Sequence, residues 1–394
     1  MKKILIHHHA ISFKDENGIW IQSVIGQWIT SLSKYFEEIG LLSHVSNEKI
    51  PIQDTLISGN NVVLHSLGPA GNFNDRFTRS KRIIEVCSSL KNKYDLLLVR
   101  GITPRQLIIW NNINVKSSKK YFLLVCSIEN DIKFWQIKSF LAFYHFHMMI
   151  YRRYELKKML ASGSLFVNGL NLIKETKRLL NKESYFIPTN TLSNNEFTKF
   201  KVRGINKQIK LLFCGRIEEK KGIVEAIKSL KILEKKNLNT SMDFIGPFGN
   251  TNFEVYIKSM IKNLKIKTPI KFHGRIPYGN KLFKFYKEAD IFIFPTYTEG
   301  FPHVIWEAAA NCCPVLTTPV GSIPTILKHG EHCLFFPPKN PQEIADAIIN
   351  ILNDEKLRKR IVKNLFMLAK NYTLEICASK LSKKIELDFN NYND

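Results

Sequence analysis

The chain alternates short runs of β-branched and aromatic residues with longer amphipathic stretches, and this alternation extends over both halves of its 394 residues. Such a rhythm is typical of parallel sheets whose strands are joined by crossover helices. Ten runs are predicted as strands, five in each half: Lys3–Ile6, Val62–His65, Asp95–Val99, Phe122–Cys126, Ser164–Asn168, Lys210–Cys214, Ser241–Ile245, Ile270–His273, Ile291–Phe294 and Pro314–Thr317. The pattern predicts an α/β protein with two doubly wound, Rossmann-like domains.

The length also favours two domains, because single hydrophobic cores stop growing at roughly 250–300 residues. We place an N-terminal domain at residues 1–190 and a C-terminal domain at residues 209–372. Residues 191–208 are expected to be a linker, since Pro188-Thr189-Asn190 is followed by a polar, basic stretch. Residues 373–394 are expected to form a helix that crosses back to the N-terminal domain.

The chain carries 58 Lys and Arg against 34 Asp and Glu, a formal net charge of +24. This excess favours anionic partners such as nucleotides, nucleic acid or an acidic membrane surface, although a codon bias toward A and T explains part of it equally well. The seven cysteines have no paired C-x-x-C spacing and suit buried thiols in a reducing compartment. Polar His7, His8 and His9 follow the first strand where a signal peptide would stay apolar. We therefore expect a cytoplasmic location.

The stretch from Ile132 to Leu160 interleaves aromatic residues with Lys and Arg. Its apolar part is shorter than the roughly 20 residues that a spanning helix needs. Two interpretations stay open. The stretch is either an ordinary packed helix or an interfacial helix on the inner face of an anionic membrane.

The most informative motif is Thr298-Glu299-Gly300-Phe301-Pro302-His303-Val304-Ile305-Trp306-Glu307, which follows a predicted strand. Pro302 suits the first turn of a helix, where its missing N–H costs nothing. The free amides around Gly300 and Phe301 would attract an anion, whereas Glu299 and Glu307 are natural acceptors for sugar and ribose hydroxyls. A ligand that offers both features is a nucleotide sugar.

A second motif follows the first strand of the same half, at Gly215-Arg216 and then Lys221-Gly222. Gly215 allows a ligand to approach the backbone closely. Arg216 and Lys221 supply fixed positive charge for a diphosphate, so that no metal ion is required. The adjacent Lys220 is interpreted as a solvated lysine without a role in binding.

Taken together, Gly215-Arg216-x4-Lys221-Gly222 and Glu299-x7-Glu307 resemble glycosyltransferase family 4, also called glycosyl transferases group 1. The resemblance implies the GT-B architecture of two facing Rossmann-like domains and transfer with retention at the anomeric carbon. It also implies that Arg216 and Lys221 bind the donor diphosphate, Glu299 the transferred sugar and Glu307 the ribose. By the same resemblance, the backbones of Gly300, Phe301, Pro302 and Ile276 would contact the donor.

The first half matches the family less well. Gly18, in a loop expected from Phe13 to Ile19, is the best candidate to approach the donor phosphates from the N-terminal domain. Glu129 or Asp131 could contact the acceptor. The chain contains no Asp-x-Asp pair, so we expect no metal site and no cofactor.

The sequence therefore predicts an enzyme that moves a hexose or N-acetylhexosamine from a nucleoside diphosphate sugar to a glycan or lipid-linked hydroxyl acceptor. Cell-surface polysaccharide, lipopolysaccharide or lipid-linked glycan synthesis fits such an enzyme. Two alternatives stay open: a sugar-nucleotide epimerase with the same architecture, and, on charge alone, a nucleic-acid-binding protein.

Overall fold

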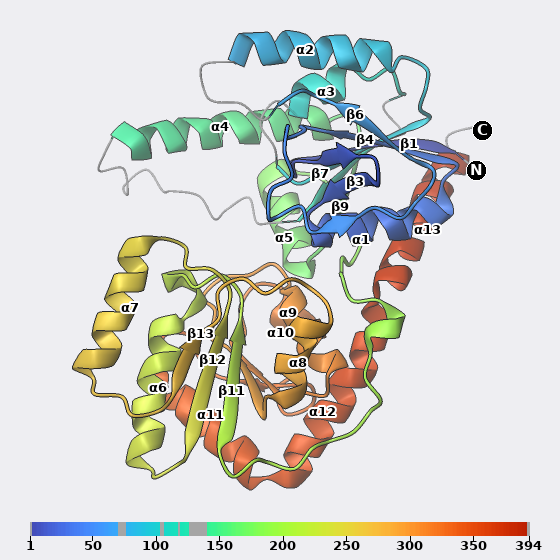
Figure 1. Cartoon of the computed structure of the whole chain (residues 1–394). Helices are drawn as coiled ribbons and strands as arrows, with labels where there is room; N and C mark the ends of the chain where they lie inside the picture. The colour runs from blue at the N-terminus through green and yellow to red at the C-terminus, as the bar shows by residue number, and fades with distance from the viewer. Residues whose placement is uncertain (1, 70–75, 103–105, 117–118, 126–139, 392–394) are drawn as a thin grey trace. The chain divides into compact units, whose positions relative to one another are not determined.

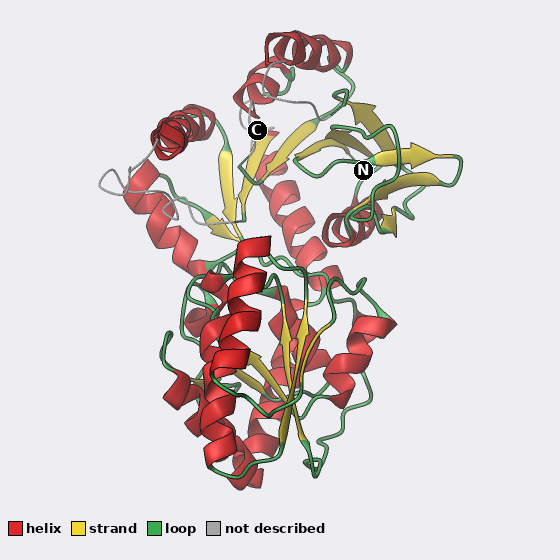
Figure 2. Cartoon of the chain, turned by 60° about the vertical axis from the view of Figure 1, so that its left-hand side comes forward, coloured by secondary structure: helices red, strands yellow, loops and turns green. Residues whose placement is uncertain are grey.

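The computed structural model describes residues 2–69, 76–102, 106–116, 119–125 and 140–391. The chain divides into two compact units, one made of Met1–Thr191 with Leu374–Asp394 and the other of Leu192–Thr373. Each unit contains a parallel sheet with helices packed on it (Figure 1), and Figure 2 shows the strands of each sheet between layers of helices.

The first unit is organised by a seven-stranded parallel sheet of order β10-β9-β8-β7-β1-β4-β6. Its strands, in chain order, are β1 (Lys3–His8), β4 (Glu38–Ser43), β6 (Val62–Ser66), β7 (Leu96–Arg100), β8 (Lys120–Leu124), β9 (Ser164–Val167) and β10 (Tyr185–Phe186). A small antiparallel sheet joins β2 (Phe13–Asp15), β3 (Gly18–Ile21) and β5 (Thr55–Leu56). The central strands are buried on both faces, which explains their continuous apolar sequence.

Two apolar cores lie on opposite faces of this sheet. The helices of the unit are α1 (Ser23–Leu32), α2 (Arg76–Ser89), α3 (Gln106–Asn112), α4 (Phe140–Leu160), α5 (Leu170–Leu180) and α13 (Leu374–Asn391). Helix α13 packs against α1 (Figure 1) and buries Leu374, Ala378, Leu381 and Ile385 at helical spacing in the core that α1 covers. The last segment of the chain is thus part of the first unit.

The second unit contains a six-stranded parallel sheet of order β13-β12-β11-β14-β15-β16 around one large core. Its strands are β11 (Ile209–Cys214), β12 (Thr240–Ile245), β13 (Ile270–Phe272), β14 (Ile291–Phe294), β15 (Val315–Thr317) and β16 (Leu334–Phe335). Its helices are α6 (Ile223–Lys235), α7 (Thr251–Asn263), α8 (Asn280–Glu288), α9 (His303–Ala310), α10 (Ile323–Ile326), α11 (Pro341–Asn353) and α12 (Glu355–Ala369). None of the helices in the described ranges is both long and apolar enough to cross a bilayer.

All ten strands expected from the sequence are present, with ends that differ by at most two residues. The prediction missed β10 and β16, which have two residues each, and β4, which begins at Glu38 and contains Gly40. Gly40 is required because a Cβ there would lie 2.4 Å from the Tyr94 ring. The predicted loop from Phe13 to Ile19 was wrong, since β2 and β3 pair there as a hairpin.

The expected linker at residues 191–208 was also wrong. Leu192 is fully buried in the core of the second unit, and Phe197 packs against that core. The Phe197 ring lies edge-on to Phe366 of α12, with centroids 5.3 Å apart. This polar stretch therefore carries apolar anchors that hold it against the second unit.

Candidate active site

Three loops meet at the carboxyl edge of the second sheet, after β11, β14 and β15, and hydrogen bonds join them. The Tyr297 amide donates to the Lys220 carbonyl at 2.8 Å, and the Ser322 amide donates to the Gly300 carbonyl at 2.9 Å. The Thr318 hydroxyl donates to the Thr296 carbonyl at 2.5 Å. These bonds hold the loops that carry the two sequence motifs in a defined arrangement.

Two glycines permit this close approach of loops. Gly222 has φ +69°, and a Cβ there would lie 2.0 Å from the Pro295 carbonyl oxygen. Gly321 has φ +59°, and a Cβ there would lie 1.8 Å from the Glu299 carbonyl oxygen. A side chain at either position would force the loops apart.

The charged residues of the two motifs meet within this arrangement. Lys221 forms an ion pair with Glu299, and each side chain is only 16% exposed. Arg216 pairs with Glu218 at 2.8 Å but is 68% exposed. Both cations that the sequence assigned to a diphosphate are therefore held by carboxylates in this structure.

Glu307 lies inside the protein, 6% exposed. The Tyr286 hydroxyl of α8 donates a 2.8 Å hydrogen bond to its carboxylate. Burial raises the pKa of Glu307 to about 7; the hydrogen bond from Tyr286 opposes this shift and Glu196 adds to it. Sequence reasoning missed Tyr286, which sits at core spacing with Leu282 in α8 and differs from an ordinary core aromatic only by its hydroxyl.

The start of α9 is anchored by stacked rings. Phe301 stacks on Trp306 at 4.7 Å between centroids, and Trp306 stacks on Tyr372 at 4.9 Å. Pro302 lies at the N-cap, one residue before the first helical residue, whereas the sequence placed it inside the first turn. Its extended backbone directs the chain from Gly300 into the helix without an N–H to satisfy.

The remaining predicted site residues are spread over both units. Gly215 follows β11 with φ +147°, and its amide donates to the Ile245 carbonyl at 2.9 Å. Ile276 lies after β13 and packs partly buried against the core. Gly18 opens β3 in the first unit, where its amide donates to Asp15. Glu129 and Asp131 lie outside the described residues.

His7 and His8 lie at the end of β1 in the first unit. His7 and His8 are both buried, and Nδ1 of His7 bonds the Leu42 carbonyl at 2.9 Å. Within the described ranges, no three His, Cys, Asp or Glu side chains lie close enough to share a metal ion. The six cysteines of the described ranges are all buried, and none of them forms a disulfide there.

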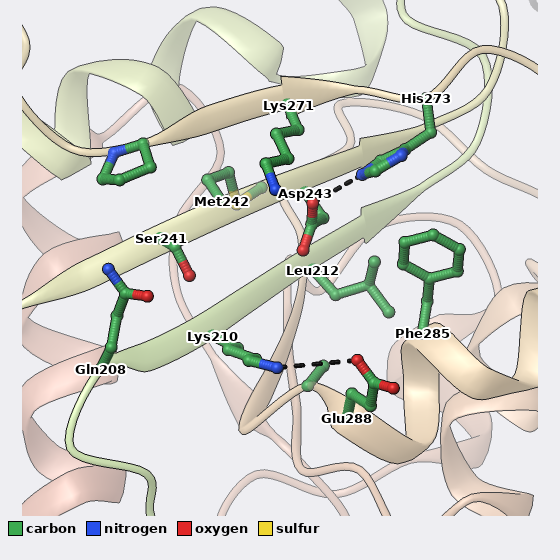
Figure 3. Close-up of a pocket in the computed structure, with 12 residues that line it drawn as sticks. Gln208, Lys210, Leu212, Ser241, Met242, Asp243, Lys271, His273, Phe285 and Glu288 are labelled. Carbon is green, nitrogen blue, oxygen red and sulfur yellow. Dashed lines mark hydrogen bonds and ion pairs between the residues drawn. The ribbon is translucent and has the colours of Figure 1, made fainter.

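A separate groove with a cavity of about 260 Å³ lies on one face of β11, β12 and β13 beside α8 (Figure 3). Asp243 accepts a 2.6 Å hydrogen bond from His273, and Lys210 pairs with Glu288 at 3.6 Å. Phe285 forms one wall. The lining includes none of the residues that the sequence assigned to the donor, so this groove is distinct from the strand-end arrangement.

Comparison with known proteins finds similarity in the second half of the chain. Residues 194–366 match the family described as glycosyl transferases group 1. An uncharacterized glycosyltransferase of Methanocaldococcus jannaschii, MJ1607, is 33% identical over 155 residues, which are 39% of this chain and 38% of the relative. CapM of Staphylococcus aureus, a capsular polysaccharide biosynthesis glycosyltransferase, is 32% identical over 174 residues, 44% of each chain. The match thus spans less than half of these curated relatives.

Solved structures extend the likeness in fold to nearly the whole chain. Sucrose-phosphate synthase from Thermosynechococcus elongatus matches with a TM-score of 0.74 and 15% identity over 99% of both chains. Anabaena HepE in complex with UDP and glucose matches with a TM-score of 0.71 and 13% identity over 98% of this chain and 100% of that chain. The fold is that of the GT-B glycosyltransferases. In its second half, residues 194–366, the chain is similar to the glycosyl transferases group 1 family.

Proposed function

We propose that this protein transfers a hexose or N-acetylhexosamine, with retention, from a nucleoside diphosphate sugar to a hydroxyl acceptor in cell-surface polysaccharide, lipopolysaccharide or lipid-linked glycan synthesis. The match of residues 194–366 to the glycosyl transferases group 1 family supports the activity. The similarity to CapM, named for capsular polysaccharide biosynthesis, supports the pathway class. The UDP and glucose held by HepE support a nucleotide-sugar donor.

The observation that carries the proposal is the Lys221–Glu299 pair at the carboxyl edge of the second sheet. When the bond between the anomeric carbon and the diphosphate oxygen breaks, negative charge develops on the leaving diphosphate. A lysine held in place for that charge stabilises the transition state more than the ground state. Exchange of the Lys221 contact from Glu299 to the diphosphate would also free the Glu299 carboxylate to accept hydrogen bonds from sugar hydroxyls.

Arg216 and Glu307 complete the proposed donor site. The exposed Arg216 exchanges Glu218 for the second phosphate, and the buried Glu307 accepts hydrogen bonds from the ribose hydroxyls. Because two fixed cations supply the positive charge, we propose that transfer needs no metal ion. Activity that survives treatment with a chelator would agree with this, and activity restored only by a divalent cation would contradict it.

A panel of UDP-, GDP- and ADP-sugars tests the proposal, with binding followed by calorimetry and slow hydrolysis by nucleotide release. Lys221→Met should lower the hydrolysis rate about 100-fold or more, the loss typical of one preorganised charge contact. Lys220→Met is the matched control, because Lys220 is the adjacent and exposed lysine. Hydrolysis by Lys221→Met at the wild-type rate, or binding of no sugar nucleotide, would contradict the proposal.

We also propose contact with an anionic membrane surface through the C-terminal half of α4. Ile150, Tyr151 and Tyr154 are each about half exposed, at 47%, 50% and 51%. Lys157 and Lys158 are exposed beside them, and Lys158 lies over the Tyr154 ring at 4.6 Å. Exposed aromatic side chains flanked by lysines suit the headgroup region of an anionic bilayer.

Sedimentation with phosphatidylglycerol vesicles tests this contact. Lys157→Glu with Lys158→Glu should abolish sedimentation, whereas Lys356→Glu with Lys359→Glu, an exposed pair on α12, should not. Equal sedimentation of both double variants, or none for the wild type, would remove the membrane from the list of partners.

A further inference from the structure

The first unit contains a buried guanidinium that no carboxylate of the described residues neutralises. Arg100 ends β7 and is 4% exposed. Within the described ranges, its buried Nε and Nη1 atoms have no hydrogen-bond partner, and no acidic side chain there raises its pKa. Burial lowers the pKa of Arg100 to about 10, so the group stays charged at neutral pH.

The neighbours of Arg100 position it without balancing its charge. Its guanidinium carbon lies 4.6 Å from the centroid of the Trp28 ring of α1. His8 is its register partner on β1, so the two side chains share one face of the sheet. Nδ1 of His8 accepts the Ala10 amide at 2.8 Å, which leaves the proton on Nε2. Burial, followed by the charge of Arg100, lowers the pKa of His8, so His8 is neutral and still a donor.

This arrangement is costly for a purely structural residue. Desolvation of an ion costs more free energy than a cation–π contact returns. A leucine or methionine at position 100 would fill the space against Trp28 without that cost. An anion at the guanidinium would provide the missing compensation, because arginine binds phosphate and carboxylate groups through two parallel hydrogen bonds.

The position of Arg100 in the sheet points to a ligand as well. From β1 the sheet continues through β4 and β6 on one side and through β7, β8, β9 and β10 on the other. The strand order therefore reverses between β1 and β7. Open α/β sheets bind ligands at the carboxyl ends of the strands at such a reversal. His8 and Arg100 are the last residues of these two strands.

We infer that Arg100, with Nε2 of His8 as a second donor, binds an oxyanion carried by the acceptor, either a phosphate or a carboxylate. This inference rests on the proposed function, since it names the chemical class of the acceptor. It adds a charged group that the acceptor must carry.

Thermal unfolding of the full chain in inorganic phosphate tests the site, at constant ionic strength and in a Lys221→Met background that weakens phosphate binding at the donor site. The unfolding midpoint of the Lys221→Met protein should rise by several degrees as the phosphate concentration increases, because phosphate binds preferentially to the folded state. Adding Arg100→Gln should raise the midpoint without phosphate and remove the response. Adding Arg360→Gln, an exposed arginine on α12, should leave the response intact.

A response that persists with Arg100→Gln overturns the inference, and so does a midpoint that falls without phosphate, since Arg100 would then be structural. If Arg100→Gln does not fold, Arg100→Lys decides the question. Because lysine keeps the charge but not the paired donors, it should weaken phosphate binding about 10-fold, and unchanged binding overturns the inference.

Methyl phosphate, glucuronate and neutral glucose then distinguish the oxyanion. Stabilisation by methyl phosphate or by glucuronate, lost with Arg100→Gln, identifies the group; equal stabilisation by glucose overturns the inference. UDP-sugar binding is measured on the same variants. If no donor binds, the proposed transferase function is contradicted, whereas the Arg100-dependent response to phosphate can still be present. The proposed function and the Arg100 inference are therefore tested separately.

Discussion

Glu307→Gln should change how the stability of the protein depends on pH. The pKa of Glu307 is raised from 4.5 to about 7 in the folded chain, chiefly by burial. The folded state thus holds a proton that the unfolded state releases, so this residue makes stability fall as pH rises from about 4.5 to about 7. Each pKa unit corresponds to about 1.4 kcal/mol, which gives a loss of about 3 kcal/mol, complete above pH 7.

The neutral glutamine has nearly the same shape and no proton to lose. Relative to the wild type, Glu307→Gln should gain about 3 kcal/mol between pH 4.5 and pH 8. Urea unfolding of the full chain, followed by circular dichroism at several pH values, measures the difference. Glu331→Gln, an exposed glutamate, is the control for loss of one carboxylate. Parallel pH profiles for the wild type and Glu307→Gln would refute the reasoning that burial controls this carboxylate.

The same carboxylate links donor binding to pH under the proposed function. Ribose hydroxyls donate to the ionised form, so bound donor should lower the pKa of Glu307 and donor affinity should rise between pH 6 and pH 8. Glu307→Gln should lose both this pH dependence and part of the affinity. The substitution therefore stabilises the fold and weakens the site, which a purely structural role for Glu307 would not produce.

Three further substitutions test the packing around the site and the fold. Tyr286→Phe removes the hydrogen bond to Glu307 and should cost about 1.5–3 kcal/mol at pH 8, where the carboxylate is charged, and less at pH 5; urea titrations at both pH values measure it. Gly321→Ala should weaken UDP-sugar binding by 10-fold or more, because its Cβ would meet the Glu299 carbonyl, and affinity equal to the wild type would contradict this. Leu381→Ala should destabilise the first unit by about 2–5 kcal/mol, seen as early exchange of amides in β1 and not in β11.

The strands of both sheets could be predicted because buried parallel strands leave an unmistakable sequence pattern. Phe292 and its neighbours in β14 are apolar without interruption. Strand β4 escaped prediction because Gly40 interrupts its apolar run, and the reason for that glycine, the ring of Tyr94, lies 54 residues away. Contacts of that separation leave no local pattern in the sequence.

The candidate site also contains residues that the sequence could predict and residues that it could not. The motif spacing predicted that Lys221 and Glu299 serve one site, and the structure joins them in an ion pair. The sequence could not indicate that Tyr286 binds Glu307, because helix α8 would need a core aromatic there in any case. Arg100 was likewise not singled out, since an arginine at the end of a strand usually reaches solvent. Only its burial against Trp28 reveals an unbalanced charge.

Under the proposed function, the Lys221–Glu299 ion pair joins the cation that would bind the diphosphate to the carboxylate that would bind the sugar. A ligand with a diphosphate but no sugar must displace Glu299 from Lys221 and gains nothing from the carboxylate it frees. Glu299→Gln removes that competitor, so UDP should bind more tightly, by about 10-fold if the pair contributes about 1.4 kcal/mol. Hydrolysis of the UDP-sugar should slow at the same time, because the freed carboxylate no longer orients the sugar. Weaker UDP binding by Glu299→Gln would mean that Glu299 positions Lys221 instead of competing for it.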